Sequence, residues 1–202
     1  TNRRHDDIFR TSLQLAAMDT LFQGVCRPGR QFHTETRIPS RMKAIETAAM
    51  SSAELRVNSE RLRKDIDDLA EIGRAEDFGI YRMAFSEGDM AGRAWFRERV
   101  EESGLMFHQD GAANLYARLN WDEQTPSIMA GSHLDTVPGA GHLDGALGVV
   151  CALEAVRTLN ESGIQLSRPV EAVSFSDEEG RFGGLFGSQA VAGLVTPEYL
   201  HN

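Results

Sequence analysis

The chain has 202 residues, of which 41% are hydrophobic and 25% charged, an ordinary globular composition with room for one or two domains. Its net charge of −9 gives no electrostatic reason to bind nucleic-acid phosphates, and no apolar run reaches the roughly 20 residues of a membrane helix. Two cysteines are too few for a disulfide framework, and the first residues lack the apolar core of a secretion signal. We therefore expect a cytoplasmic protein that binds neither nucleic acid nor a membrane.

The first part of the chain shows no sustained periodicity. Pro28, Gly29 and Pro39 interrupt it, so we expect residues 1–49 to be poorly structured or extraneous to the fold. A regular pattern begins only after Met50, which suggests the hypothesis that this methionine is the natural start.

Two amphipathic helices are predicted next. The first starts at Ser59, carries apolar residues at helical spacing and ends by Gly73. The second covers 86–104 and ends at Gly104. Its predicted inner stripe comprises Met90, Trp95, Phe96 and Val100.

The remaining elements predict a sheet. Residues 105–109 and 114–119 flank an Asp-Gly turn, which favours a β-hairpin. An apolar strand at 126–132, an apolar helix at 145–163 and a strand at 168–176 then form a βαβ unit, whose strands we expect to be covered on both faces. The expected fold class is α/β, with a partly parallel sheet flanked by helices.

This topology places polar residues at one edge of the sheet. His133 and Asp135 follow the first strand of the βαβ unit, Asp144 opens its helix, and Glu178 and Glu179 follow its second strand. Ligands of open parallel sheets bind at the carboxyl ends of the strands. We therefore expect these side chains to converge.

Each of these residues also has a purely structural interpretation. An isolated His-x-Asp pair is most often a loop histidine hydrogen-bonded to a neighbour, although Asp135 could also hold the imidazole of a metal-bound His133. Asp144 is by default a helix N-cap, a role compatible with ligand binding.

The "SDEEG" stretch at 176–180 favours a metal. Its three adjacent carboxylates repel one another unless a cation lies nearby, and one can bind that cation while its neighbour acts as general base. A donor set of His, Asp and Glu without thiolate suits zinc, manganese, cobalt or nickel. Together, these observations favour a metal hydrolase site.

The segments "GSHLDTVPGAGHLDGALGV" (131–149) and "SDEEGRFGGLFGS" (176–188) resemble the dinuclear-metal aminoacylase/carboxypeptidase-like peptidase family. Within it, they are most similar to the branch of N-carbamoyl-L-amino acid hydrolases, beta-ureidopropionases and allantoate amidohydrolases. The peptidase branch tends to have "GRGxxDxKG" where this chain has "GHLDGALGV". The resemblance extends from about Leu55 to about Leu194 and is strongest at 131–151 and 174–189.

The resemblance implies a small-molecule substrate, two divalent metal ions and a role for each residue. His133 would bind one ion, with Asp135 orienting it, and Glu179 would bind the other. Asp144 would bridge the two ions, and Glu178 would be the general base. The implied fold is a zinc-peptidase-like catalytic domain.

Family members are longer than this chain, with an inserted lid and dimerisation domain and further histidine ligands. We therefore interpret residues 50–202 as the amino-terminal portion of the catalytic domain, without the lid. The resemblance implies that the full-length protein is a homodimer and that this portion is inactive alone. Two alternatives stay open: a peptidase or deacylase of the same superfamily, and a non-catalytic binding protein with a vestigial site.

Overall fold

The computed structural model describes residues 55–196 and residue 199. The expectations for residues 1–49 and for Met50 lie outside these residues. No helix in the described part of the chain is long and apolar enough to cross a membrane.

One four-stranded mixed sheet organises the described residues, with strand order β1-β2-β4-β3. β1 and β2 form the predicted antiparallel hairpin, β2 pairs antiparallel with β4, and β4 pairs in parallel with β3. The α/β class and the predicted βαβ unit are confirmed. The strands are β1 (Met106–Gln109), β2 (Leu115–Leu119), β3 (Ile128–His133) and β4 (Val170–Phe175).

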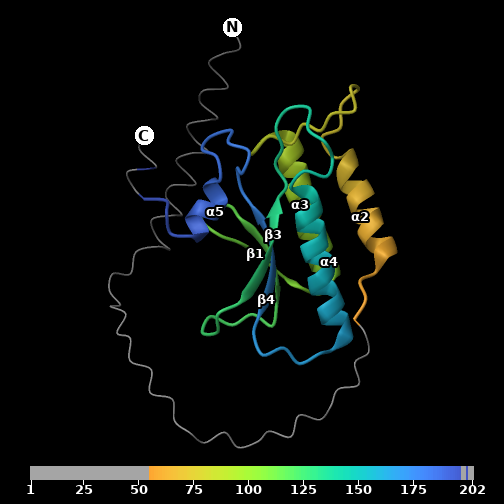
Figure 1. Ribbon diagram of the computed structural model, residues 1–202, viewed down its shortest axis with the longest axis vertical. Helices are drawn as coiled ribbons and strands as arrows, with labels where there is room; N and C mark the ends of the chain where they lie inside the picture. Colours follow the sequence, from red (N-terminus) through yellow and green to blue (C-terminus); the bar gives the residue numbers. More distant parts are fainter. Residues whose placement is uncertain (1–54, 197–198, 200–202) are drawn as a thin grey trace, which may run out of the picture. The chain divides into compact units, whose positions relative to one another are not determined.

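Helices lie on both sides of this sheet. Figure 1 shows α2, α3 and α4 on one side, with α2 outermost, and α5 on the other. Side-chain oxygens cap the first two helices, since Asn58 accepts from the Arg61 N–H and Ser86 accepts from the Asp89 N–H. The helices are α2 (Ser59–Glu71), α3 (Glu87–Glu102), α4 (Ala146–Ser162) and α5 (Phe186–Val191).

The hydrophobic core lies between the sheet and the inner helices. Phe96 and Val100 of α3 are fully buried there, as are Val149 and Leu153 of α4. The prediction that Met90 belongs to the inner stripe of its helix is wrong, because its side chain is 52% exposed. Met90 lies on the same face of α3 as the exposed Ala94 and Arg97, whereas Asp89 in the same turn is buried.

β3 departs from the expectation that both faces of the parallel strands are covered. Ile128 is 59% exposed and Met129 38% exposed. Within the described residues, β3 is an edge strand that pairs only with β4. The apolar run therefore predicted the strand correctly, but the prediction that both of its faces are buried is wrong.

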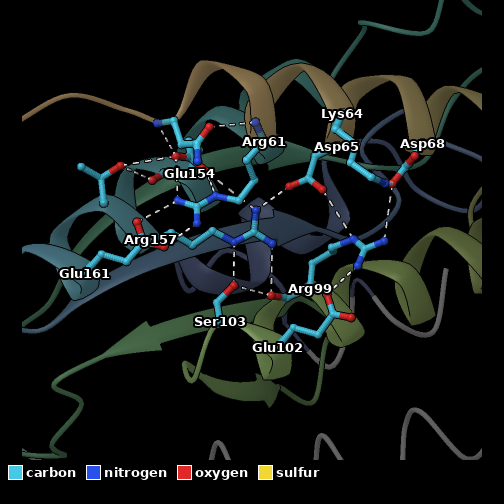
Figure 2. A network of polar contacts seen from close by, with 12 residues as sticks. Arg61, Lys64, Asp65, Asp68, Arg99, Glu102, Ser103, Glu154, Arg157 and Glu161 are labelled. Atoms are coloured by element: carbon cyan, nitrogen blue, oxygen red, sulfur yellow. Dashed lines mark hydrogen bonds and ion pairs between the residues drawn. The ribbon is translucent and has the colours of Figure 1, made fainter.

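A network of buried charges attaches α2 to the helices beneath it (Figure 2). The guanidinium of Arg157 on α4 pairs with the Asp65 carboxylate on α2 and donates to Ser103 Oγ at 2.6 Å. Arg61 on α2 forms a two-pronged pair with Glu154 on α4, at 2.7 and 2.9 Å. Because these groups come from elements far apart in the chain, helical periodicity alone did not predict their pairing.

Candidate metal centre

His133 is the last residue of β3, and its imidazole is held in one orientation. Its Nδ1 lies 2.9 Å from the main-chain oxygen of Asp135. A carbonyl oxygen can only accept, so Nδ1 donates this bond, and Nε2 is the ring nitrogen left to face a metal ion. Nε2 lies 3.4 Å from Glu178 Oε2, which places the available nitrogen on the side of the acidic residues.

Asp135 orients the imidazole in a different way from the one expected. Its carboxylate Oδ1 lies 3.9 Å from His133 Nδ1, beyond hydrogen-bonding distance, whereas its carbonyl makes the bond. The other carboxylate oxygen, Oδ2, accepts from the main-chain N–H of Glu179 at 3.1 Å. Asp135 therefore bonds His133 at the end of β3 through its carbonyl oxygen, and Glu179 after β4 through its carboxylate.

Three candidate metal ligands converge from three segments. One ligand atom each from His133, Asp144 and Glu179 lies within 4.8 Å of the others. Because a zinc ion lies about 2.0–2.2 Å from each nitrogen or oxygen ligand, atoms up to about 4.3 Å apart can share it. The 4.8 Å limit of this group is close to that separation, so the donor set and its spacing fit a divalent cation.

Asp144 is not the N-cap of α4. The cap position belongs to Gly145, which has a φ of +62° and no side-chain capping bond. The exposed Asp144 carboxylate is therefore not engaged in capping the helix, which was its default interpretation. This leaves it available to the cluster with His133 and Glu179.

Gly145 also has a packing role that the sequence did not reveal. A Cβ atom at this position would lie 2.4–2.5 Å from three atoms of the His133 ring. Only glycine allows the imidazole to lie directly against the start of α4. The sole sequence indication was a glycine between Asp144 and an apolar helix.

The electrostatics of the cluster favour a cation. Partial burial raises the pKa of Glu179, and the charges of Asp144, Glu178 and Asp135 raise it further, while His133 opposes them. Burial also raises the pKa of Asp135, against the hydrogen bond from the Glu179 N–H. Asp135 Oδ1 is buried without a hydrogen-bond partner among the described residues. A positive ion would relieve this concentration of negative charge.

Asp177 does not belong to the cluster, although it is the first carboxylate of "SDEEG". Its buried carboxylate accepts from the main-chain N–H groups of Arg181, Phe182 and Gly183 at 2.7, 3.0 and 2.8 Å. Those bonds satisfy its oxygens and shape the loop after β4. Of the three adjacent carboxylates, Asp177 is therefore held by its own loop, although its charge still acts on Asp135, and Glu178 and Glu179 are the two that lie at the cluster.

Known proteins share this arrangement of segments. The profile of Peptidase family M28 matches residues 114–200. The N-carbamoyl-L-amino-acid amidohydrolase of Pseudomonas sp. (strain NS671) is 39% identical over 147 residues, 71% of this chain and 36% of that enzyme. The allantoate deiminase 1 of Glycine max is 39% identical over 134 residues, 63% of this chain and 28% of that enzyme. A hydantoinase/carbamoylase family amidase from Burkholderia ambifaria is 36% identical, with a TM-score of 0.67 over 71% of this chain and 36% of that one.

The chain is a relative of the carbamoylase-type amidohydrolases. It spans about a third of the length of the relatives it matches, 36% in the Pseudomonas enzyme. The matched region of the M28 profile contains all five candidate site residues, from His133 to Glu179. The resemblance stated from the two motifs is confirmed at this level, and the roles of individual residues stay predictions.

Proposed function

We propose that this carbamoylase relative is part of a metal-dependent hydrolase of linear C–N bonds in N-carbamoyl amino acids, ureido acids or allantoate. The observation that carries the proposal is the convergence of His133, Asp144 and Glu179, with Glu178 beside the free imidazole nitrogen. The relatives are named for hydrolysis of N-carbamoyl-L-amino acids and allantoate, and these names support the substrate class.

The roles follow from the chemistry of each group. His133 and Glu179 would each hold one divalent ion, and Asp144 would lie between the two. Ions of zinc, manganese, cobalt or nickel would supply Lewis acidity that polarises the substrate carbonyl and lowers the pKa of water. Glu178 would take the proton from the attacking water and transfer it to the leaving nitrogen. The products from a carbamoyl substrate would be ammonia, carbon dioxide and the amino acid.

Three candidate ligands are too few for two ions. A single catalytic zinc commonly has three protein ligands, so two ions require residues beyond His133, Asp144 and Glu179. We propose that the 202-residue chain alone binds metal weakly and turns over little or no substrate. We also propose that residues 50–202 are the amino-terminal portion of a catalytic domain, in a cytoplasmic protein that is a homodimer at full length.

A chimera tests the catalytic role. The 147-residue stretch of the Pseudomonas enzyme to which this chain is 39% identical would be replaced by this chain's matching residues. We expect the chimera to release ammonia from N-carbamoyl-L-amino acids when supplied with manganese. We expect Glu178→Gln to lower kcat by about 10²–10⁴-fold, because the amide cannot accept the proton. Calorimetric metal affinity should change little, since the ligand candidates remain.

The control and the rival functions use the same chimera. Glu76→Gln changes a carboxylate outside the cluster and should leave kcat unchanged. Full activity of the Glu178→Gln chimera would refute the general-base role. Cleavage of dipeptides or acyl amino acids without ammonia release would favour the peptidase or deacylase alternative, for which the M28 profile match speaks. A folded chimera that binds metal but hydrolyses neither class would favour a binding protein.

A further inference from the structure

Arg82 is a fully buried arginine in the connection between α2 and α3, with 0% of its surface exposed. Its guanidinium donates to three main-chain oxygens, each at 3.0 Å. Nη1 bonds the carbonyls of Leu69 and Ile72 at the end of α2, and Nε bonds the carbonyl of Leu134. Burial of an arginine is costly unless its donors are satisfied, so this placement calls for an explanation.

Arg82 forms hydrogen bonds with the residues immediately before and after Asp135 in the sequence. Before Asp135, the Leu134 carbonyl accepts from Arg82 Nε. After it, Thr136 makes two bonds: its N–H donates to the Arg82 carbonyl and its Oγ1 accepts from the Arg82 N–H, both at 3.0 Å. Three bonds to Arg82, one through its side chain and two through its main chain, thus fix the chain immediately before and after Asp135.

Asp135 is the residue through which the candidate ligands are joined. Its carbonyl holds His133 Nδ1 at 2.9 Å, and its Oδ2 holds the Glu179 N–H at 3.1 Å. Its buried Oδ1 and the buried Nη2 of Arg82 both lack hydrogen-bond partners among the described residues. The opposite charges of Arg82 and Asp135 also attract each other.

We propose that Arg82 is a positioning residue for the candidate metal centre: by holding residues 134–136, it sets the direction of the His133 imidazole and the place of Glu179. Within the described residues Arg82 makes no hydrogen bond to a candidate ligand, so it acts through residues 134–136. The metal part of this inference rests on the proposed function, whereas the orientation of His133 does not.

A matched arginine separates positioning from general stabilisation. Arg157 is also buried, at 3% exposure, and donates to Ser103, Asp65 and the Arg99 carbonyl. None of these contacts involves the candidate cluster. Arg157→Gln should therefore destabilise the fold without moving His133.

The experiment uses the metal-free 202-residue chain with ¹⁵N-labelled histidine, in which His133→Gln identifies the His133 signals. In the wild type we expect Nδ1 to carry the proton. We expect Arg82→Gln to shift the tautomer balance of His133 towards protonated Nε2, because the Asp135 carbonyl loses its fixed position. Thr136→Val, which removes only the Oγ1 acceptor, should cause a smaller shift in the same direction, and Arg157→Gln should cause none.

Zn²⁺ titration calorimetry provides the second readout. It compares the wild type with the Arg82→Gln, Arg82→Lys, Thr136→Val and Arg157→Gln variants, at a temperature where all are folded. We expect Arg82→Gln to weaken Zn²⁺ binding about 10–100-fold, the range for groups that orient metal ligands. Arg82→Lys, which keeps the charge but not the three-way fork, should restore part of the affinity.

Each outcome decides the inference. If the Arg82 variants shift the His133 tautomer balance no more than Arg157→Gln does, Arg82 is only a structural residue and the inference is wrong. If the wild type binds no Zn²⁺ but the His133 tautomer responds to Arg82→Gln and not to Arg157→Gln, the positioning role holds and the metal part of the inference fails for this chain, whereas the proposed function is decided by the chimera. Response of both readouts to Arg82 alone supports both.

Discussion

Replacing Gly145 by alanine is expected to weaken Zn²⁺ binding by about 100-fold and to destabilise the fold by about 2–4 kcal/mol. The added Cβ would lie 2.4–2.5 Å from three ring atoms of His133, so the imidazole must move away from Asp144 and Glu179. The φ of +62° adds backbone strain that an L-residue avoids. Urea unfolding and Zn²⁺ calorimetry on the 202-residue chain measure the two effects.

Two other glycines separate the causes. Gly163 at the far end of α4 has a φ of +66°, and a Cβ at this position would have no atom within 4 Å, so Gly163→Ala tests backbone strain alone. Gly141 lies in the same loop as Gly145, has open space around it and has no positive φ. Gly141→Ala therefore introduces neither a clash nor backbone strain and serves as the control. Both should retain wild-type Zn²⁺ affinity. Equal loss of affinity in Gly163→Ala and Gly145→Ala would show that the contact with His133 is unimportant.

Replacing Arg157 by methionine is expected to destabilise the fold by about 3–5 kcal/mol, because it leaves the buried Asp65 carboxylate largely uncompensated, with only the longer ion pair to Arg99 Nε at 3.5 Å. The Arg157 and Asp65 side chains are at most 5% exposed. Urea unfolding followed by the fluorescence of Trp95 and Trp121 measures the change. Loss of stability should be accompanied by earlier detachment of α2, which the network joins to α3 and α4 (Figure 2).

A second substitution gives this prediction its control. Asp65→Leu in the Arg157→Met background removes the uncompensated charge as well, and we expect it to recover most of the lost stability. Arg97→Met disrupts an exposed pair with Glu101, whose side chains are 61% and 53% exposed, and should change little. If Arg157→Met behaves like Arg97→Met, the buried network does not hold α2.

Much of the fold was predictable because it depends on local chemistry. Helical spacing located α2 and α3, and an Asp-Gly turn between two apolar runs located the β1–β2 hairpin. The strand–helix–strand order of β3, α4 and β4 also predicted the edge of the sheet where His133, Asp144 and Glu179 converge. Parallel strands joined by a right-handed crossover bring their carboxyl ends together whatever their other contacts.

The details of the site were not predictable in this way. Whether Asp135 holds His133 by its carboxylate or its carbonyl depends on the turn after β3, and that turn is held by Arg82, 54 residues from Thr136 in the chain. The N-cap position of α4 is Gly145 and not Asp144, and the His133 ring, from another segment, packs against this glycine.

The sequence by itself determined the α/β class, the order of elements, the relation to carbamoylase-type amidohydrolases and the identity of the converging residues. Periodicity, turn residues and motif spacing are properties of neighbours in the chain. Only the tertiary structure decided that Asp177 is held by its own loop, that most of β3 is exposed, that Arg82 bonds the chain beside Asp135, and that Gly145 lies against His133. These features arise from contacts between segments brought together by packing, which local patterns do not encode.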